Sequence, residues 1–507
     1  MPKNSNCIKI CVLILSLLCF SSTGDQNSFI FSRFNRFNLS TDALLFARSS
    51  LEDSTLSPWF SYLLLPVEER GAFQFIASGQ RVGVDIGAVA GMEYLESSNR
   101  FGALSGKVFY RSKFLDAYII TDVYSTERRI NPETQDIQFE RFIKENAHEP
   151  ITGMFDFRVN LPVAFLEAKL KYLTLSIGKQ KLRWGPGYKG TLGLSGTAYS
   201  PFYYYNLNLQ FADFFHAGAF LCGYDDESIY SSELELKDTL KIKSTGRQIK
   251  TGFPRYGAGQ RLDVRIGKHL QIGIYELVDF FGANELTRFA NPLQIYYLSN
   301  ESSGTNNANL LGGMDINLIL GRFRIYGDFL NDDITVFEHT GNPNKYAYQA
   351  GAVYYGRGML VESGVEYTHV SRYVYSHSKI LSRHGHWGES MGWPWGNDMD
   401  LFHSRAVFAF PRNVYGKVEL NYWIRGKGGI EDDWYADGKP DLDHAPYWPQ
   451  FADRRVTGIV GVEYKPLPWI NTALFYEPVW KKGGFENGIN FYLEVSVPGR
   501  FEYRVEE

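Results

Sequence analysis

The feature that most constrains this chain is an alternation of apolar and polar residues that recurs from about residue 80 to the C-terminal region. In "RVGVDIGAVAGMEY", Val82, Val84 and Ile86 share one face, whereas Gly83 and Asp85 share the other. The segments "RFRIYGDFLND", "GKVELNYWIR" and "GINFYLEVSV" alternate in the same way. A period of two is typical of β-strands, so the pattern predicts an all-β fold.

The alternating segments have the length that a tilted strand needs to cross a bilayer, about nine to eleven residues. Beyond the N-terminal region the sequence has no apolar run of about 18 residues, so any membrane crossing is made by strands. A soluble all-β protein would also alternate. Aromatic residues, 16% of the chain, gather near the predicted strand ends, and glycines fall on the predicted inward faces. Together these features favour a transmembrane antiparallel β-barrel.

The first residues are typical of a secretory signal peptide. Lys3 and Lys9 precede a short apolar run, and Ser22, Thr23 and Gly24 offer a small-residue cleavage site. Residues 1–24 are therefore predicted to be removed, so three of the four cysteines would leave with them. The remaining chain could form no internal disulfide.

The rest of the chain divides into two predicted parts. Residues 25–79 carry leucines among polar residues, with prolines that limit helix length, and predict a short helical or irregular periplasmic segment. Residues 80–507 form the predicted barrel. A short turn is expected around Lys171 and Tyr172, and four long connections are expected over 126–152, 223–258, 371–399 and 427–455. Short periplasmic turns and long outside loops are characteristic of outer-membrane barrels.

The stretch "SIGKQKLRWGPGYKGTLGLSG" begins in phase with a strand, so Lys179, Lys181 and Arg183 fall on the lipid-facing side. Cations in hydrocarbon cost a few kcal/mol each near the midplane. Either the membrane ends near residue 178, or a bulge at Gly178 exchanges the two faces. The cations would then meet phosphates of lipopolysaccharide or, in the lumen, an acidic polymer. Trp184 fits an interfacial aromatic girdle, and the following Gly-Pro-Gly is typical of a turn.

The segment "IGKQKLRWGPGYKGTLGLSGTAYSP" resembles the hallmark stretch of the capsule assembly Wzi family of bacterial outer-membrane proteins. "FANPLQIYYLSNE", "GGMDINLILGRFRIYGDFLNDD", "VESGVEYTHV" and "GHWGESMGWPWGNDMDLF" follow in that family's order. The resemblance implies a barrel of about 18 strands, with 16 also possible, in the outer membrane of a Gram-negative cell. It also implies a lectin-like protein that fastens capsular polysaccharide or exopolysaccharide to the cell surface.

Carbohydrate binding needs aromatic platforms for the apolar sugar faces, polar groups for hydroxyls, and cations for any acidic sugars. One predicted loop contains His386, Trp387, Trp393, Trp395 and Asp398, and a second contains Trp434, Tyr435, Tyr447 and Trp448. The hypothesis is that polysaccharide or lipopolysaccharide binds through the following residues: Lys179, Lys181, Arg183, Trp184, Lys189, His386, Trp393, Trp395 and Asp398. The same aromatic residues could instead serve loop packing or the girdle.

Other chemistries find little support in the sequence. The formal charge of −4 argues against a nucleic-acid partner. The run from Gly193 to Thr197 lacks the last glycine and the helix of a nucleophile elbow, so Ser195 is predicted to lie in a loop. His384 and His386 form too weak a pattern for a metal site. We therefore expect a non-enzymatic monomer without metal or cofactor, whose partners are polysaccharide and outer-membrane lipid. A sugar or ion channel and an outer-membrane hydrolase remain the alternatives.

Overall fold

The computed structural model describes residues 73–77, 80–94, 98–126, 157–196, 202–211, 214–224, 254–301, 307–333, 344–356, 358–386, 389–426, 428–430, 432, 453–467, 470–496 and 501–505. The predicted signal peptide, most of the predicted periplasmic segment, Trp387 and the loop with Trp434, Tyr435, Tyr447 and Trp448 lie outside these residues.

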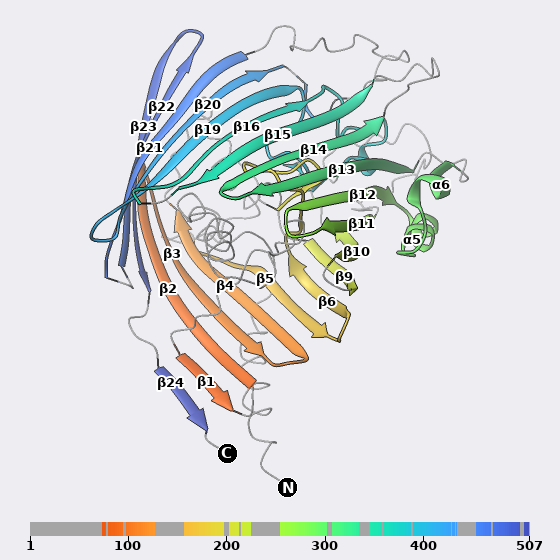
Figure 1. The fold of residues 1–507 in the computed structure, drawn as a ribbon, viewed down its shortest axis with the longest axis horizontal. Coiled ribbons are helices and arrows are strands. Elements are labelled where there is room, and N and C mark those ends of the chain that lie inside the picture. Colours follow the sequence, from red (N-terminus) through yellow and green to blue (C-terminus); the bar gives the residue numbers. More distant parts are fainter. Residues whose placement is uncertain are drawn as a thin grey trace, which may run out of the picture.

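Most of the described chain, about 70%, is β-strand (Figure 1). The strands of the first half are β1 (Phe73–Ala77), β2 (Gln80–Tyr94), β3 (Ser98–Arg111), β4 (Leu115–Thr126), β5 (Phe157–Lys169), β6 (Leu173–Gln180), β7 (Arg183–Trp184), β8 (Leu194–Ser195), β9 (Phe202–Phe211), β10 (Phe215–Tyr224), β11 (Arg255–Ile266) and β12 (Leu270–Phe281). Those of the second half are β13 (Ala308–Leu320), β14 (Phe323–Asp333), β15 (Lys345–Tyr355), β16 (Leu360–Val370), β17 (Gly385–His386), β18 (Glu389–Ser390), β19 (Met399–Phe410), β20 (Val414–Arg425), β21 (Asp453–Leu467), β22 (Ile470–Lys481), β23 (Gly484–Ser496) and β24 (Phe501–Val505). The helices are α5 (Ala283–Phe289), α6 (Tyr296–Glu301) and the 3-10 helix η3 (Ile380–Ser382).

Eighteen of these strands form one antiparallel wall. Each pairs with its neighbour along the chain, and β23 pairs with β2 from Ile489 opposite Tyr94 to Ser496 opposite Gly87, which completes the ring. β1 lies antiparallel to β2 and parallel to β24. The prediction of about 18 strands is confirmed, and the first strand of the wall, β2, begins at Gln80.

The alternation of side chains places apolar residues on the outside of the wall. On β14, Phe323 and Ile325 are exposed, whereas Arg324 and Tyr326 are 4% and 2% exposed. Polar residues point inward and apolar residues outward, the reverse of a soluble protein. Lipid solvates the outer face of a membrane barrel, so this inversion is the one that its wall requires.

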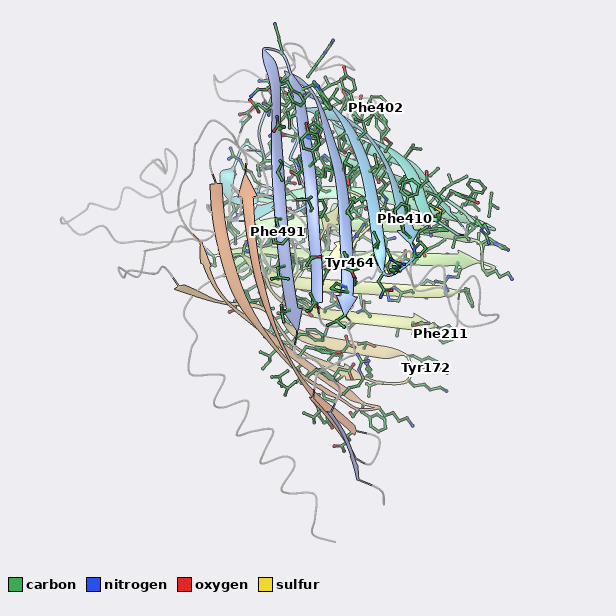
Figure 2. All side chains as sticks on the ribbon, turned by 90° about the vertical axis from the view of Figure 1, so that its left-hand side faces the viewer. Tyr172, Phe211, Phe402, Phe410, Tyr464 and Phe491 are labelled. Atoms are coloured by element: carbon green, nitrogen blue, oxygen red, sulfur yellow. The ribbon has the colours of Figure 1, made fainter. Side chains whose placement is uncertain are left out.

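Aromatic side chains mark the outer wall at the ends that carry short turns. Figure 2 shows Tyr172 and Phe211 beside each other, and their ring centroids are 5.9 Å apart. Phe410 and Tyr464 stand on the outer wall near two further short turns, and both are exposed. Aromatic rings prefer the membrane–water interface, so this set forms the girdle that the sequence predicted.

Connections at the two ends of the wall differ in length as predicted. The turn at residues 170–172 joins β5 to β6, and the long connections over 127–156, 225–254, 371–398 and 426–452 leave the opposite end. By the rule for outer-membrane barrels, the end with long connections faces the cell exterior. Within the described residues no helix has the length and apolar character needed to cross a membrane.

Candidate functional site

The lumen face of the wall carries charged side chains that bind one another. Arg261 on β11 is 1% exposed and donates hydrogen bonds to Asp263 and Asp315, each at 2.6 Å. A buried charge is tolerated only when it is paired and hydrogen-bonded. Such pairs give the inner wall a fixed pattern of charge against which other parts of the chain pack.

The first inner segment, residues 181–196, leaves the wall after β6 and folds into the lumen. Its β7 and β8 pair as a short hairpin, and Trp184 is 3% exposed. The indole lies 5.2 Å from the ring of Phe220 and 6.3 Å from that of Tyr275, both on the inner wall. The assignment of Trp184 to the girdle is therefore wrong, because its ring is buried against the inner wall and does not face lipid.

The ladder also decides between the two readings of Gly178. Its pairing with Phe165 and Tyr204 continues without a shift of register to Gln180, where β6 ends. No bulge exchanges the faces before β6 ends at Gln180, so the prediction of a bulge at Gly178 is wrong. Lys179 keeps its outward register but is only 5% exposed, and its ammonium lies 5.2 Å from the ring centroid of Tyr203.

Wall carboxylates hold the backbone of the first inner segment. Glu366 on β16 accepts the N–H groups of Tyr188 at 2.6 Å and Lys189 at 3.2 Å. Asp328 on β14 accepts the N–H of Leu192 at 3.3 Å. Arg324 donates to the carbonyl of Pro186 at 2.6 Å. These contacts satisfy a loop backbone that is buried away from water, which otherwise would be costly.

Glycines let this segment approach its neighbours closely. A Cβ atom on Gly190 would overlap Pro394, and one on Gly187 would overlap the side chain of Gln349. The Gly-Pro-Gly element therefore does more than turn the chain, because its backbone at Gly187 fits directly against the wall, as that of Gly190 fits against another loop.

The second inner segment, residues 371–398, packs on the first. Tyr375 has a positive φ of 71° and is fully buried. Its hydroxyl donates to the carbonyl of Leu192 at 2.8 Å and accepts the N–H of Trp393 at 3.0 Å, while its own N–H donates to Asp332 at 2.7 Å. Burial raises the pKa of Tyr375, so the hydroxyl stays protonated and able to donate.

His384 is the second tie between the two inner segments. Its Nδ1 lies 2.6 Å from a carboxylate oxygen of Asp279, and its Nε2 lies 2.8 Å from the carbonyl of Gly193. Both ring nitrogens therefore face acceptors, an arrangement that suits the imidazolium. Burial disfavours the charged form, but attraction to Asp279 outweighs it and the pKa of His384 is raised. The pKa of the nearby His377 is lowered to about 3 by burial and by Lys345.

The inner segments use most of the predicted site residues for their own packing. Trp393 is fully buried, and Asp398 accepts the N–H of Gly428 at 2.8 Å. His386 packs against the rings of Phe202 and Tyr224. Side chains so deeply buried make no contact with a polymer in this conformation.

The predicted cations are also engaged. Arg183 donates to the carbonyl of Gly187, and Lys189 forms an ion pair with Glu419 on β20. Lys181 and Arg183 are half-buried. Part of the positive charge of this stretch is therefore paired with a carboxylate of the inner wall. The spacing of the cations in the sequence does not predict this pairing.

One aromatic corner remains partly exposed. The rings of Trp395 and Trp423 meet edge to face with centroids 5.0 Å apart, and both side chains are half-buried. Lys189 lies 5.9 Å from the centroid of Trp395, and Trp423 donates from its indole N–H to Thr457 at 3.0 Å. Trp423 is absent from the predicted site because it lies on a strand and not in a predicted loop, although the alternation of "GKVELNYWIR" puts it on the polar face.

Within the described residues, the side chains form neither a metal site nor a nucleophile elbow. No group of three or more His, Cys, Asp or Glu side chains there could hold a metal ion. Ser195 lies in β8, is fully buried, and donates its N–H to the carbonyl of Met391. The strand-to-helix context of a nucleophile elbow does not follow it.

A closed wall with lipid-type residues outside, charges inside and loops folded into the lumen defines an outer-membrane β-barrel. A model of the capsule assembly protein Wzi family matches residues 91–468. The chain belongs to that family, as the sequence resemblance predicted.

A solved structure agrees with this fold. The chain is similar to Wzi of Escherichia coli, described as an outer-membrane protein involved in group 1 capsule assembly and a carbohydrate-binding β-barrel. The TM-score is 0.51 at 14% identity, covering 82% of this chain and 85% of that one. OccD3 of Pseudomonas aeruginosa gives a TM-score of 0.48 at 9% identity, covering 84% and 94%. Comparison with curated proteins gives no match.

Proposed function

We propose that this barrel binds capsular polysaccharide or exopolysaccharide at its outer end and holds it at the cell surface without chemical change, acting as a monomer. Membership of the capsule assembly family supports the role, as does the carbohydrate binding described for the Escherichia coli relative. The observation that carries the proposal is the half-buried corner of Trp395 and Trp423 beside Lys189.

That corner has the chemistry of a sugar subsite. Indole rings offer flat apolar faces to the C–H faces of a sugar, and an ammonium group recognises carboxylates of acidic sugars. Lys181 and Arg183 could extend the contact because they are half-buried rather than enclosed. Trp184 and Trp393, which were predicted to bind polymer but are buried, would then support the subsite by packing.

Polymer retention tests this function in cells. In a deletion strain that carries Trp395→Leu, we expect cell-bound polysaccharide to fall several-fold and polymer in the medium to rise by the same amount. Trp480→Leu is the matched control, because Trp480 is 46% exposed on the outer wall. A fall in total polymer, rather than in its retention, would contradict anchoring.

Purified protein tests binding directly. Loss of one aromatic platform should weaken the affinity for the strain's own polysaccharide by about tenfold, the scale of a stacking contact plus its buried area. Unchanged affinity in Trp395→Leu would remove the corner from the proposed site.

The two alternatives have their own measurements. The inner segments pack on the inner wall from β9 to β19, so we expect planar bilayers to show no steady conductance at low voltage. Persistent open conductance would favour the channel. Turnover of polysaccharide or lipid that Ser195→Ala abolishes would favour the hydrolase.

A further inference from the structure

Residues 282–301, which follow β12, lie against the outside of the barrel wall. Phe289 of α5 and Tyr296 of α6 pack in one cluster with Val278, Phe280 and Ala308. On β12, Val278 and Phe280 alternate with the inward-facing Leu277 and Asp279, so their side chains point outward. In Figure 1 the two helices stand beside the ends of β11, β12 and β13.

This segment covers polar groups at membrane depth. Glu276 lies only six residues along β12 from Leu270, which follows a short turn. A strand needs about nine to eleven residues to cross the hydrocarbon, so Glu276 falls within that span. It faces outward, where a bare carboxylate would contact lipid at high cost.

The covering segment satisfies that carboxylate. Tyr296 donates its N–H to Glu276 at 3.0 Å, and Gln260 on β11 donates to the same oxygen at 2.9 Å. Gln260 also donates to the carbonyl of Gln294 at 2.8 Å. Two of these hydrogen bonds fix residues 294–296 to the outer face of the wall, and the third joins the two wall side chains to each other.

The free side of the segment is apolar. Leu293 is 91% exposed, and Ile295, Tyr297 and Leu298 are 54%, 55% and 61% exposed. No charged residue occurs from position 291 to 298. The exposed side of α5, in contrast, carries the polar Asn284 and Thr287.

The apolar side continues the lipid-facing band of the wall. Ile274, Leu262 and Met314, which lie closer to the short turns on the three strands beneath the segment, are 53%, 43% and 52% exposed. Large exposed apolar surface on one face of a membrane barrel is matched by hydrocarbon. Tyr297 adds a ring with a polar end, which suits the headgroup boundary.

We propose that residues 291–298 form a ledge on the outer wall whose apolar side chains insert into the acyl-chain region of the outer leaflet. Near the long-connection ends of β11, β12 and β13, the ledge therefore contacts lipid in place of the wall's own outward side chains. This inference depends on the barrel's place in the membrane and is independent of polysaccharide binding.

Collision measurements on spin-labelled protein test the ledge. In a barrel without the predicted signal peptide, whose remaining cysteine Cys222 is replaced by serine, labels are attached at Leu293→Cys or Leu298→Cys. The protein is then placed in phosphatidylethanolamine–phosphatidylglycerol vesicles. We expect both labels to collide with dissolved oxygen at least several-fold more effectively than with a water-soluble nickel chelate. Ile274→Cys provides the lipid reference and Thr287→Cys the aqueous reference.

Two outcomes would overturn the proposal. Labels at both ledge positions that behave like Thr287→Cys would place the ledge in water. Labels shielded from both reagents would indicate that protein, such as a second copy of the chain, covers the ledge. Because the labelled side chains project away from the barrel, neither substitution disturbs its packing.

Discussion

At the scale of single residues, the inner segments are held by a few charged side chains. Asp279 accepts hydrogen bonds from both His384 and the hydroxyl of Tyr224, the latter at 2.6 Å. Glu419 is approached by Lys189 and by Lys417, the latter at 2.8 Å. Asp279 and Glu419 each join an inner segment to a strand that is distant in sequence. Loss of either carboxylate would therefore affect the inner segment more than the barrel.

The raised pKa of His384 predicts a pH dependence for this loop. A group whose folded pKa is raised stabilises the fold fully below its unfolded pKa, about 6.5 for histidine. The contribution disappears as the pH rises through the folded pKa. We expect hydrogen-exchange protection of residues 371–398 to fall with increasing pH by about ten- to a hundredfold, the scale of a charged hydrogen bond of ~1.5–3 kcal/mol.

The control for this effect is His384→Gln. This variant should have low protection at every pH and no step, while strand amides distant from the loop stay unchanged. A step that persists in the variant would assign the pH dependence to another group.

At the scale of elements, the two inner segments act as one packed unit. Residues 181–196 contribute small backbone surfaces and carbonyl groups, and residues 371–398 contribute the rings that pack against them and hydrogen-bond to them. Between them they occupy the lumen beside a wall of polar residues. Loops of this kind are stable only because the wall satisfies their backbone groups.

Gly190→Val tests this close fit, because its side chain would overlap Pro394. Overpacking of this kind costs typically about 1–3 kcal/mol. We expect faster protease cleavage within the inner segments, whereas the barrel keeps its heat-dependent shift in gel mobility. Gly312→Ala is the matched control, since nothing lies within 4 Å of a Cβ there. Equal resistance of both variants would show that the segments are not tightly apposed.

At the scale of the whole molecule, the lipid-facing side chains determine that the folded barrel is stable in a bilayer. Val365, in the middle of β16, is 59% exposed, and Met359, in the preceding turn, is 57% exposed. The two positions have equal exposure but different predicted depths in the bilayer. They therefore separate the effect of the membrane from that of exposure alone.

Arginine at these positions tests the depth. Val365→Arg should lower the free energy of unfolding in phospholipid vesicles by about 2–4 kcal/mol, as expected near the midplane, and Met359→Arg by about 0–1 kcal/mol. Urea titration of the reconstituted barrel measures both. Equal losses at the two positions would contradict the assigned depth.

The alternation predicted the wall well because each strand position sees only lipid or lumen. Phe323, Ile325, Arg324 and Asp328 all lie on the predicted faces, and the turn near Tyr172 lies where expected. The candidate site was predicted less well. Trp184 is of the residue type that girdles contain. Nothing within its own segment distinguishes an aromatic ring at the membrane interface from one packed inside the lumen.

The amino-acid sequence by itself determined the strands, their inward and outward faces and the family, because a period of two and an ordered set of motifs are local properties. Only the tertiary structure decided that residues 181–196 turn inward and that residues 291–298 cover the outer wall. Those choices depend on partners far along the chain, such as Glu366 for Tyr188 and Asp328 for Leu192. A buried loop is stable only where such partners satisfy its backbone, and their positions are set when the ring of strands closes.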